Sequence, residues 1–235
     1  MLADKKIDQI VREYQDLGYS VVEGLFTPDE CQAIQKIAET LPSFSSGDLL
    51  PVMNPHRERP ELLETMSDTR VVSIIRRLMK GKPVGMQTQY FFCRPGTRGF
   101  SFHQDNYYVQ AADDQFVSAW LALEDVTAEN GALIVLPGSH REPMLRVREI
   151  PQPSTFGQDP NHNRQECIVE KDYPRISVAV RQGGVVFLHS HMVHSSNHNI
   201  TTDRYRRALL MTYLAEGAAF RPGYIANRSP FALKA

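Results

Sequence analysis

Residues 183–213 read GGVVFLHSHMVHSSNHNITTDRYRRALLMTY, and this stretch decides the fold. Its two apolar runs, rich in β-branched and large side chains, are typical of buried strands. The pattern predicts a strand over Val185–Leu188, a second strand beginning near His194, and a turn at NITTD that leads into a returning strand. Four of the eight histidines of the chain lie between the two apolar runs. The same stretch therefore supplies both strands and candidate metal ligands.

Short strand-like segments extend back to about residue 84. They are rich in β-branched and aromatic residues and are separated by Gly, Pro, Asn and Asp: VGMQTQYFFCRPG at 84–96, FVSAWLALEDV at 116–126 and GALIVLPGSH at 131–140. Strands that follow one another without intervening helices are typical of a sandwich or barrel. We therefore expect an all-β core over about residues 84–215.

The first 83 residues predict flanking helices instead. Apolar residues recur at helical spacing over 7–17 and stop at Gly18, a residue suited to the left-handed end of a helix. A second helix is expected over 27–41, because its opening TPDE is a capping box with proline at the first helical position. A third is expected over 68–79, with Gly81 as its terminator.

Composition restricts the class of protein and of partner. The chain has 235 residues, 42% of them hydrophobic and 23% charged, which predicts a single domain over 1–235 with a sizeable core. A net charge of -1 gives no electrostatic reason to expect nucleic acid or an anionic membrane as partner, so a small molecule is expected. Widely spaced cysteines, the lack of a continuous apolar N-terminal run and the lack of a membrane-length apolar stretch predict a cytoplasmic protein.

The segment SFHQDNYY at 101–108 places His103 and Asp105 two residues apart. On a strand, residues at this spacing project to the same face. An HxD pair by itself is as compatible with a structural histidine bonded to a carboxylate as with a metal site. The histidines of 183–213 shift this balance towards a metal site.

A candidate cation lies in the same stretch. Ser196 shares a strand face with His194, and pairing this strand with the returning strand across NITTD sets Ser196 opposite Arg206. The predicted hairpin thus brings a guanidinium beside a serine hydroxyl, one step along the strand from a histidine. Arg204 shares the strand face of Arg206 and remains an alternative, whereas Arg207 faces the other way.

Two histidines and one carboxylate on one face of a metal leave positions open for a chelating co-substrate and dioxygen, as in non-haem Fe(II) oxygenases. A 2-oxoacid chelates iron through its keto and C1 carboxylate oxygens, and its far carboxylate then needs a cation. Arg206, with Ser196 beside it, offers a bidentate charge-assisted clamp. These residue types together indicate Fe(II), a 2-oxoacid and O2.

FHQD at 102–105, WLALEDVTAENGALIVLPGSH at 120–140 and the whole of 183–213 resemble, in the right order, blocks of a known family. It is the phytanoyl-CoA dioxygenase family of Fe(II)/2-oxoglutarate-dependent oxygenases, and HSSNHNIT at 194–201 is similar to the ectoine hydroxylase pattern. The resemblance implies a double-stranded β-helix, a cupin-like jelly-roll of two packed antiparallel sheets, with the N-terminal helices against one sheet.

The resemblance also implies a role for particular residues. His103, Asp105 and His194 match the iron ligands. Arg206 matches the residue that binds the C5 carboxylate of 2-oxoglutarate, and Ser196 its helper. The implied cofactor set is therefore Fe(II), 2-oxoglutarate as co-substrate, and O2.

Three further positions follow from the same resemblance. Trp120 matches a residue that lines the co-substrate pocket. Gln89, or Gln87 on the same strand face, stands where the family tends to place an amide near the co-substrate or substrate. Gly184 departs from the family, which usually has Asp there, and we expect only a local change.

The implied reaction is hydroxylation of an unactivated C–H bond of a small metabolite, with release of succinate and CO2. Desaturation, epimerisation and cyclisation use the same site and stay open, whereas Asp105 disfavours halogenation, which typically needs a small residue there. A cupin-like isomerase or hydrolase with Zn²⁺ as Lewis acid is the alternative enzyme, and it leaves Arg206 without a task. A non-catalytic β-sandwich binding module is the third alternative.

Substrate identity is only weakly indicated. Beyond REPMLRVRE there is no compact basic cluster that would hold the phosphates of coenzyme A, so a free metabolite is favoured. Two long irregular segments, 43–60 and 141–166, are expected to form the pocket walls, because long loops over a β scaffold are often active-site covers.

Overall fold

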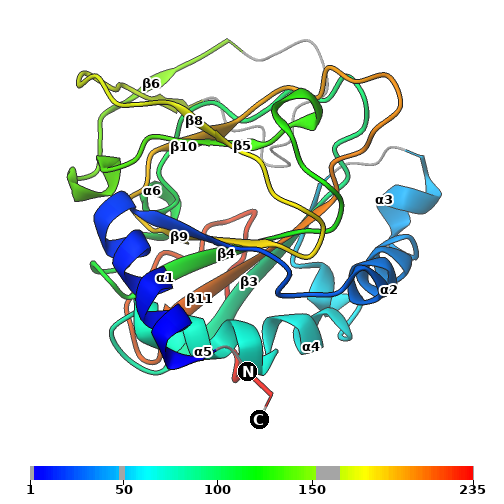
Figure 1. The fold of residues 1–235 in the computed structure, drawn as a ribbon, viewed down its shortest axis with the longest axis horizontal. Helices are drawn as coiled ribbons and strands as arrows, with labels where there is room; N and C mark the ends of the chain where they lie inside the picture. The colour runs from blue at the N-terminus through cyan, green and yellow to red at the C-terminus, as the bar shows by residue number, and fades with distance from the viewer. Residues whose placement is uncertain (1–2, 48–50, 152–164, 235) are drawn as a thin grey trace.

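The computed structural model describes residues 3–47, 51–151 and 165–234. Its core consists of two facing antiparallel sheets, a large one and a small one, which form the two layers seen in Figure 1. The large sheet has six strands in the order β1 (Tyr19–Val22), β9 (Val185–His189), β4 (Phe116–Ala122), β11 (Ala208–Ala215), β3 (Pro83–Phe91) and β2 (Val52–Met53). The small sheet has three, in the order β10 (His194–Ser196), β5 (Leu133–Val135) and β8 (Ile176–Val178). The predicted jelly-roll is confirmed.

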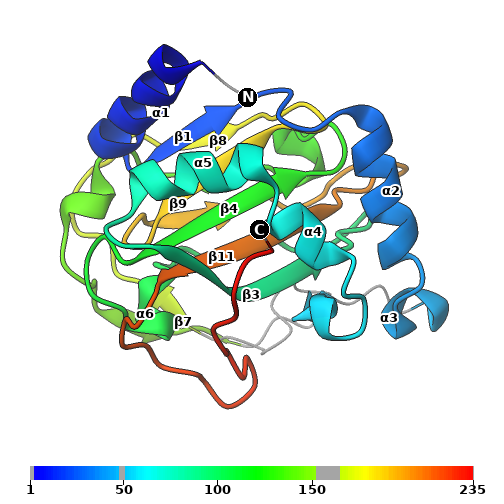
Figure 2. The same ribbon diagram turned by 90° about the horizontal axis from the view of Figure 1, so that it is seen from below.

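Helices cover the outer face of the large sheet, as Figure 2 shows for α1, α5 and α4. The α-helices are α1 (Asp4–Leu17), α2 (Pro28–Ala38), α3 (Pro42–Ser45), α4 (Leu62–Met66), α5 (Thr69–Leu78) and α6 (Asn106–Val109). Three 3₁₀ turns, η1 (Pro55–Arg57), η2 (Ala128–Asn130) and η3 (Ser139–Arg141), and the hairpin of β6 (Val147–Glu149) with β7 (Gln165–Cys167) complete the described elements. No described helix has both the length and the apolar character needed to span a membrane.

Local signals set the helix boundaries largely as expected. α1 ends at Gly18, whose φ of 83° is left-handed, and α2 opens with the capping box in which the Thr27 hydroxyl and the Glu30 carboxylate each accept a backbone N–H. The third prediction was wrong in detail, because α5 ends at Leu78 and Met79 is already extended. Gly81 therefore lies in the following turn, with a φ of 108°.

The two faces of the large sheet bury different residues. On β4, Val117, Ala119 and Leu121 pack against the helices in the main core, whereas Trp120 and Ala122 face the small sheet. This alternation is the period-two pattern of a strand that is buried on both faces. Each large apolar side chain buried in this way contributes about 1.5–3 kcal/mol to folding. The helices thus stabilise one face and leave the other free to form the wall of a site.

The predicted hairpin between the histidine strand and the arginine strand was wrong. β10 pairs with β5 in the small sheet, with Ser196 opposite Leu133, while β11 pairs with β3 and β4 in the large sheet. The connection between them crosses from one layer to the other. Asn199 stabilises this crossing, because its side-chain amide donates to the carbonyl oxygens of Cys93 at 3.2 Å and Arg204 at 2.7 Å.

Candidate active site

The backbones of His103 and His194 pair directly. The amide of each donates to the carbonyl of the other, at 2.9 Å for His103 to His194 and 3.0 Å in the reverse direction. This antiparallel bridge lies outside the named strands and joins the loop after β3 to the start of β10. Two histidines that are 91 positions apart in the chain are thereby held side by side, with ring centroids 4.2 Å apart.

The HxD pair does not lie on a regular strand, contrary to the prediction. His103 is in the isolated bridge, and Asp105 has a helical φ of -56° and ψ of -36° at the start of α6. The chain turns at Gln104, whose side-chain amide is buried and donates to the carbonyl of His191 at 2.8 Å. A turn therefore directs His103 and Asp105 to one point. The prediction had instead attributed this to the alternation of side chains along a strand.

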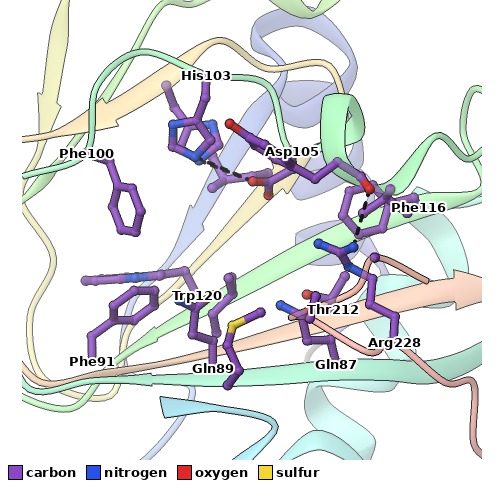
Figure 3. A pocket seen from close by; sticks show the side chains of 18 of the residues that line it. Gln87, Gln89, Phe91, Phe100, His103, Asp105, Phe116, Trp120, Thr212 and Arg228 are labelled. Atoms are coloured by element: carbon purple, nitrogen blue, oxygen red, sulfur yellow. Dashed lines mark hydrogen bonds and ion pairs between the residues drawn. The ribbon is translucent and has the colours of Figure 1, made fainter. Parts of the chain in front are cut away.

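The three side chains converge on one point between the sheets. The Asp105 Oδ1 atom lies 3.6 Å from His103 Nε2 and 3.8 Å from His194 Nε2. All three donor atoms lie within 4.8 Å of one another, and no other such group occurs in the described parts of the chain. Figure 3 shows the His103 imidazole and the Asp105 carboxylate at the top of the cavity, pointing towards each other.

Hydrogen bonds hold each of these groups in its orientation. His103 Nδ1 lies 2.8 Å from the Ser101 carbonyl, and His194 Nδ1 lies 3.0 Å from the Met192 carbonyl. Each Nδ1 must carry the proton to make such a bond, so each Nε2 presents its lone pair to the cavity. Burial, and then the neighbouring His194, lower the pKa of His103, which keeps that imidazole neutral and able to bind a metal.

Ser118 holds the carboxylate. Its hydroxyl, on β4, donates to Asp105 Oδ2 at 2.8 Å, which leaves Oδ1 directed at the histidines. Ser118 is 1% exposed, so its hydrogen bond is shielded from water. This contact could not be predicted, because a single serine within FVSAWLA has no local feature that marks it as a partner of a distant carboxylate.

The three side chains open into a cavity of about 380 Å³ between the sheets. Its floor is formed by large-sheet strands in register: Gln89 and Trp120 flank Leu210 in one row, and Gln87 and Ser118 flank Thr212 in the next. Both glutamines named as alternatives thus face the cavity, as does Trp120. Pockets of this size, in which apolar and aromatic walls surround converging polar groups, are typical small-molecule sites.

Arg206 lies at one end of this cavity. Its side chain is 1% exposed and stacks with two aromatic rings, at 5.5 Å from the Phe91 centroid and 5.6 Å from the Trp120 centroid. These are cation–π distances, and burial lowers the pKa of Arg206 from its ordinary value. A guanidinium has so high an ordinary pKa that it stays charged, so this end of the cavity favours an anion.

The structure distinguishes the three neighbouring arginines. Arg206 lines the cavity. Arg204 is an exposed residue that pairs with Glu129, and Arg207 pairs with Glu124 at 2.8 Å. Ser196 also lines the cavity, and its hydroxyl accepts the Phe100 amide at 2.9 Å. Ser196, on β10, and Arg206, just before β11, therefore line one cavity, although the hairpin that predicted their proximity does not exist.

Other histidines of 183–213 lie outside the group of three. His189 is 3.5 Å from Asp114, and His191 is 3.4 Å from Asp113 and also contacts the Asn106 side chain at 2.9 Å. His198 is exposed and accepts the Gly99 amide at 3.4 Å.

The segment after β11 forms a wall that the sequence analysis missed. Six of its residues line the cavity: Arg221, Gly223, Tyr224, Ile225, Ala226 and Arg228. Of the two loops expected as walls, 43–60 contributes Met53, and no described residue of 141–166 lines the cavity. Residues 48–50 and 152–164 of those loops lie outside the described part of the chain. The only sign of the wall after β11 in the sequence is a segment rich in Gly, Pro and Arg that follows the last strand.

Comparison with known proteins agrees with this site. The family model described as phytanoyl-CoA dioxygenase matches residues 14–208, which include the small sheet, all strands of the large sheet except β11, and the three converging side chains. The chain belongs to the phytanoyl-CoA dioxygenase family. The predicted family is thereby confirmed.

Relatives of this phytanoyl-CoA dioxygenase family member are distant in sequence. Phytanoyl-CoA dioxygenase domain-containing protein 1 of Danio rerio is 27% identical over 86% of this chain and 88% of its own length. Ectoine dioxygenase of Sphingopyxis alaskensis is 26% identical over 92% of this chain and 78% of its own. The structure of the epimerase SnoN, in complex with Fe3+, alpha ketoglutarate and nogalamycin RO, has a TM-score of 0.76 and 21% identity and covers 94% of this chain and 88% of its own.

Proposed function

We propose that the protein is an Fe(II)- and 2-oxoglutarate-dependent oxygenase in which His103, Asp105 and His194 hold the iron. Two neutral imidazoles and one carboxylate are the donor set of non-haem Fe(II) oxygenases. Metal–ligand bonds to such donors are about 2 Å long, so two donors of one ion lie at most about 4 Å apart, and Asp105 Oδ1 meets this limit at 3.6 and 3.8 Å from the two Nε2 atoms. The hydrogen bonds that each Nδ1 donates and the one that Asp105 Oδ2 accepts are the outer contacts that orient metal ligands.

The observation that carries the proposal is a buried cation in the cavity of these ligands. 2-Oxoglutarate has two carboxylates, and only one takes part in chelation. Arg206 binds the other in charge-assisted hydrogen bonds, assisted by Ser196, between the rings of Phe91 and Trp120. An isomerase or hydrolase that uses only a Lewis-acidic metal has no need of a second buried charge.

The bound iron, with 2-oxoglutarate and O2, supplies an oxidation in which 2-oxoglutarate becomes succinate and CO2 and one oxygen atom enters a C–H bond of the substrate. The protein positions and shields the reactants. Gln89, in register with Trp120, lies beside the co-substrate, whereas Gln87 and Thr212 face the remaining space. That space holds a small substrate, and the carbon nearest the three ligands is the one that reacts.

We infer hydroxylation as the outcome, because the site retains the carboxylate ligand Asp105, whose position a halogenating site would leave to halide. The similarity to the epimerase SnoN lies in the fold. Hydroxylation and epimerisation at carbon both begin with removal of a C–H hydrogen, and substrate placement decides between them. Product analysis by mass spectrometry separates the two, since only hydroxylation adds one oxygen atom.

The test needs no knowledge of the substrate. Anaerobic addition of Fe(II) and then 2-oxoglutarate is expected to produce a weak visible metal-to-ligand charge-transfer band, because a 2-oxoacid chelated by its keto and carboxylate oxygens absorbs there. Succinate should form when O2 is admitted. Folded, iron-loaded protein that shows neither the band nor 2-oxoglutarate turnover would exclude the oxygenase and favour the Zn²⁺ alternative.

Ser118→Ala is expected to weaken metal binding by about ten- to a hundredfold, as losses of an outer hydrogen bond to a ligand typically do. The cause is that Asp105 loses the 2.8 Å hydrogen bond that directs Oδ1 at the histidines. Calorimetric titration with Co(II) measures the affinity without turnover. Ser20→Ala is the matched control, because Ser20 is a buried serine of the same sheet whose hydroxyl has no hydrogen bond within the described residues. An equal loss in both variants would contradict the positioning role.

A further inference from the structure

A second arginine, Arg228, enters the cavity from the segment that follows β11. This segment is anchored to the large sheet beside it, because Phe231 and Gly85 exchange backbone hydrogen bonds of 2.8 and 3.0 Å. Figure 3 shows Arg228 on the side of Phe116, Gln87 and Thr212, away from Phe91 and Trp120. Arg206 and Arg228 therefore lie towards opposite ends of the cavity.

Strand geometry gives the scale of this separation. Arg206 stacks on Phe91, whereas Arg228 lies on the side of Gln87, four residues back along the same strand. At about 3.3 Å per residue, four residues span roughly 13 Å. His103, Asp105 and His194 lie on the opposite wall of the same cavity. A co-substrate bound to Arg206 thus leaves Arg228 for a different molecule.

The guanidinium of Arg228 is held only by carbonyl groups. Its Nη1 donates to the carbonyl oxygens of Tyr108 at 3.3 Å, Pro222 at 3.3 Å and Arg221 at 3.4 Å, all long for hydrogen bonds. No carboxylate of the described residues forms an ion pair with it, and none supplies an acceptor to its Nε or Nη2. A Cβ on Gly223 would lie 2.9 Å from Nη1, so the glycine makes room for this placement.

Burial makes this arrangement costly. Arg228 is half-buried, and burial lowers its pKa, while the Asp105 charge acts in the opposite direction. A partly desolvated cation without an anionic partner is destabilising unless a ligand supplies the anion. Arg221, an exposed neighbour in the same wall, is tied to the Tyr107 and Tyr108 carbonyls at 3.2 and 3.1 Å and adds a second positive charge.

Gln87 supplies an independent polar contact at the same end. Its side chain is 5% exposed and lines the cavity, and its Oε1 atom is buried with no hydrogen-bond partner in the described residues. An unsatisfied buried carbonyl oxygen costs about 1–3 kcal/mol. A ligand with an N–H or O–H group removes that cost. The end of the cavity beside Arg228 therefore presents one cation and one hydrogen-bond acceptor to a ligand.

We propose that the substrate is a small organic acid whose carboxylate binds Arg228, assisted by Arg221, and whose N–H or O–H group donates to Gln87. This inference rests on the proposed function, because it takes Arg206 as the site of 2-oxoglutarate. A carboxylate of a compact molecule fits better than a coenzyme A phosphate, because Arg228 faces a small cavity with the apolar side chains of Phe116 and Val109 in its wall. The neutral amide of the same acid lacks the charge and is rejected.

The test is a binding screen with Zn²⁺-loaded protein, which holds 2-oxoglutarate without turnover. The screen uses small carboxylic acids, each paired with its primary amide, and many of the acids carry a further N–H or O–H group. The compounds are ranked by the thermal shift they cause, and those that bind are titrated calorimetrically. The acids are expected to bind at least tenfold more tightly than their amides. Arg228→Gln should abolish this preference, since a charge-assisted pair is worth about ten- to a hundredfold in Kd.

Matched variants separate charge from structural damage. Arg228→Lys keeps the charge and should keep the preference at reduced affinity, and Gln87→Met should weaken binding of acids with an N–H or O–H group while sparing those without one. Arg204→Gln, an exposed arginine outside the cavity, should behave as wild type. The inference fails if no acid binds, if acids and amides bind alike, if the preference survives in Arg228→Gln, or if only coenzyme A thioesters bind. A normal charge-transfer band alongside any of these results leaves the oxygenase proposal intact, whereas loss of the band overturns that proposal instead.

Discussion

His194→Ala is expected to abolish the charge-transfer band with Fe(II) and 2-oxoglutarate and to lower metal affinity by more than a hundredfold. The variant removes one of three protein donors, and loss of even an outer contact to a ligand typically costs ten- to a hundredfold. Anaerobic absorption spectra and calorimetric titration with Co(II) measure the two effects. The fold should survive, because the backbone bridge between His103 and His194 does not use the imidazole.

His198→Ala is the matched control for that variant. His198 lies four residues after His194, is exposed and lies outside the group of three converging side chains. The charge-transfer band and the metal affinity of this variant should therefore equal those of the wild type. Retention of the band in His194→Ala would exclude His194 as a ligand. Asp105→Ala is expected to end turnover and yet retain part of the band, because two imidazoles and the chelating co-substrate still hold the metal.

Arg206→Ala is expected to raise the Kd of 2-oxoglutarate about ten- to a hundredfold and to leave metal affinity nearly unchanged. The substitution removes a charge-assisted contact of about 1.5–3 kcal/mol while the three metal-binding side chains stay in place. Trp120 is the only tryptophan of the chain, and it lies 5.6 Å from the guanidinium, so its fluorescence reports co-substrate binding directly.

Two further variants make the test specific to the charge of Arg206. Arg206→Met keeps a long side chain against Phe91 and Trp120 but removes the charge, and it should lose as much affinity as Arg206→Ala. Arg204→Ala removes an exposed arginine paired with Glu129 and should leave the Kd unchanged. The reverse pattern, with a large loss of 2-oxoglutarate affinity only in Arg204→Ala, would mean that Arg204 binds the far carboxylate of 2-oxoglutarate.

The hairpin predicted between Ser196 and Arg206 was wrong, although both residues line the same cavity. The turn residues of NITTD favoured a hairpin, and a hairpin is the shortest way to pair two nearby strands. The observed chain crosses between layers, because β10 completes the small sheet while β11 fills the centre of the large one. Local patterning does not encode which of several apolar partners a strand takes.

The sequence by itself predicted the main helices, several strands and the residue types proposed for the site. Periodicity and caps predicted α1, α2 and the start of α5, because these signals act between residues within one or two turns. The HxD pair, the distant histidine and the arginine were found because the chemistry of a metal and a dicarboxylate restricts the residue types and their order.

Only the tertiary structure decided which groups meet. The bridge between His103 and His194, the hydrogen bond from Ser118 to Asp105 and the entry of Arg228 into the cavity join segments far apart in the chain. Such contacts depend on how two sheets and a C-terminal segment pack, and the free energy of that packing comes from non-directional burial of apolar surface. A serine or an arginine leaves no periodic trace of its distant partner, so its role is visible only in the folded chain.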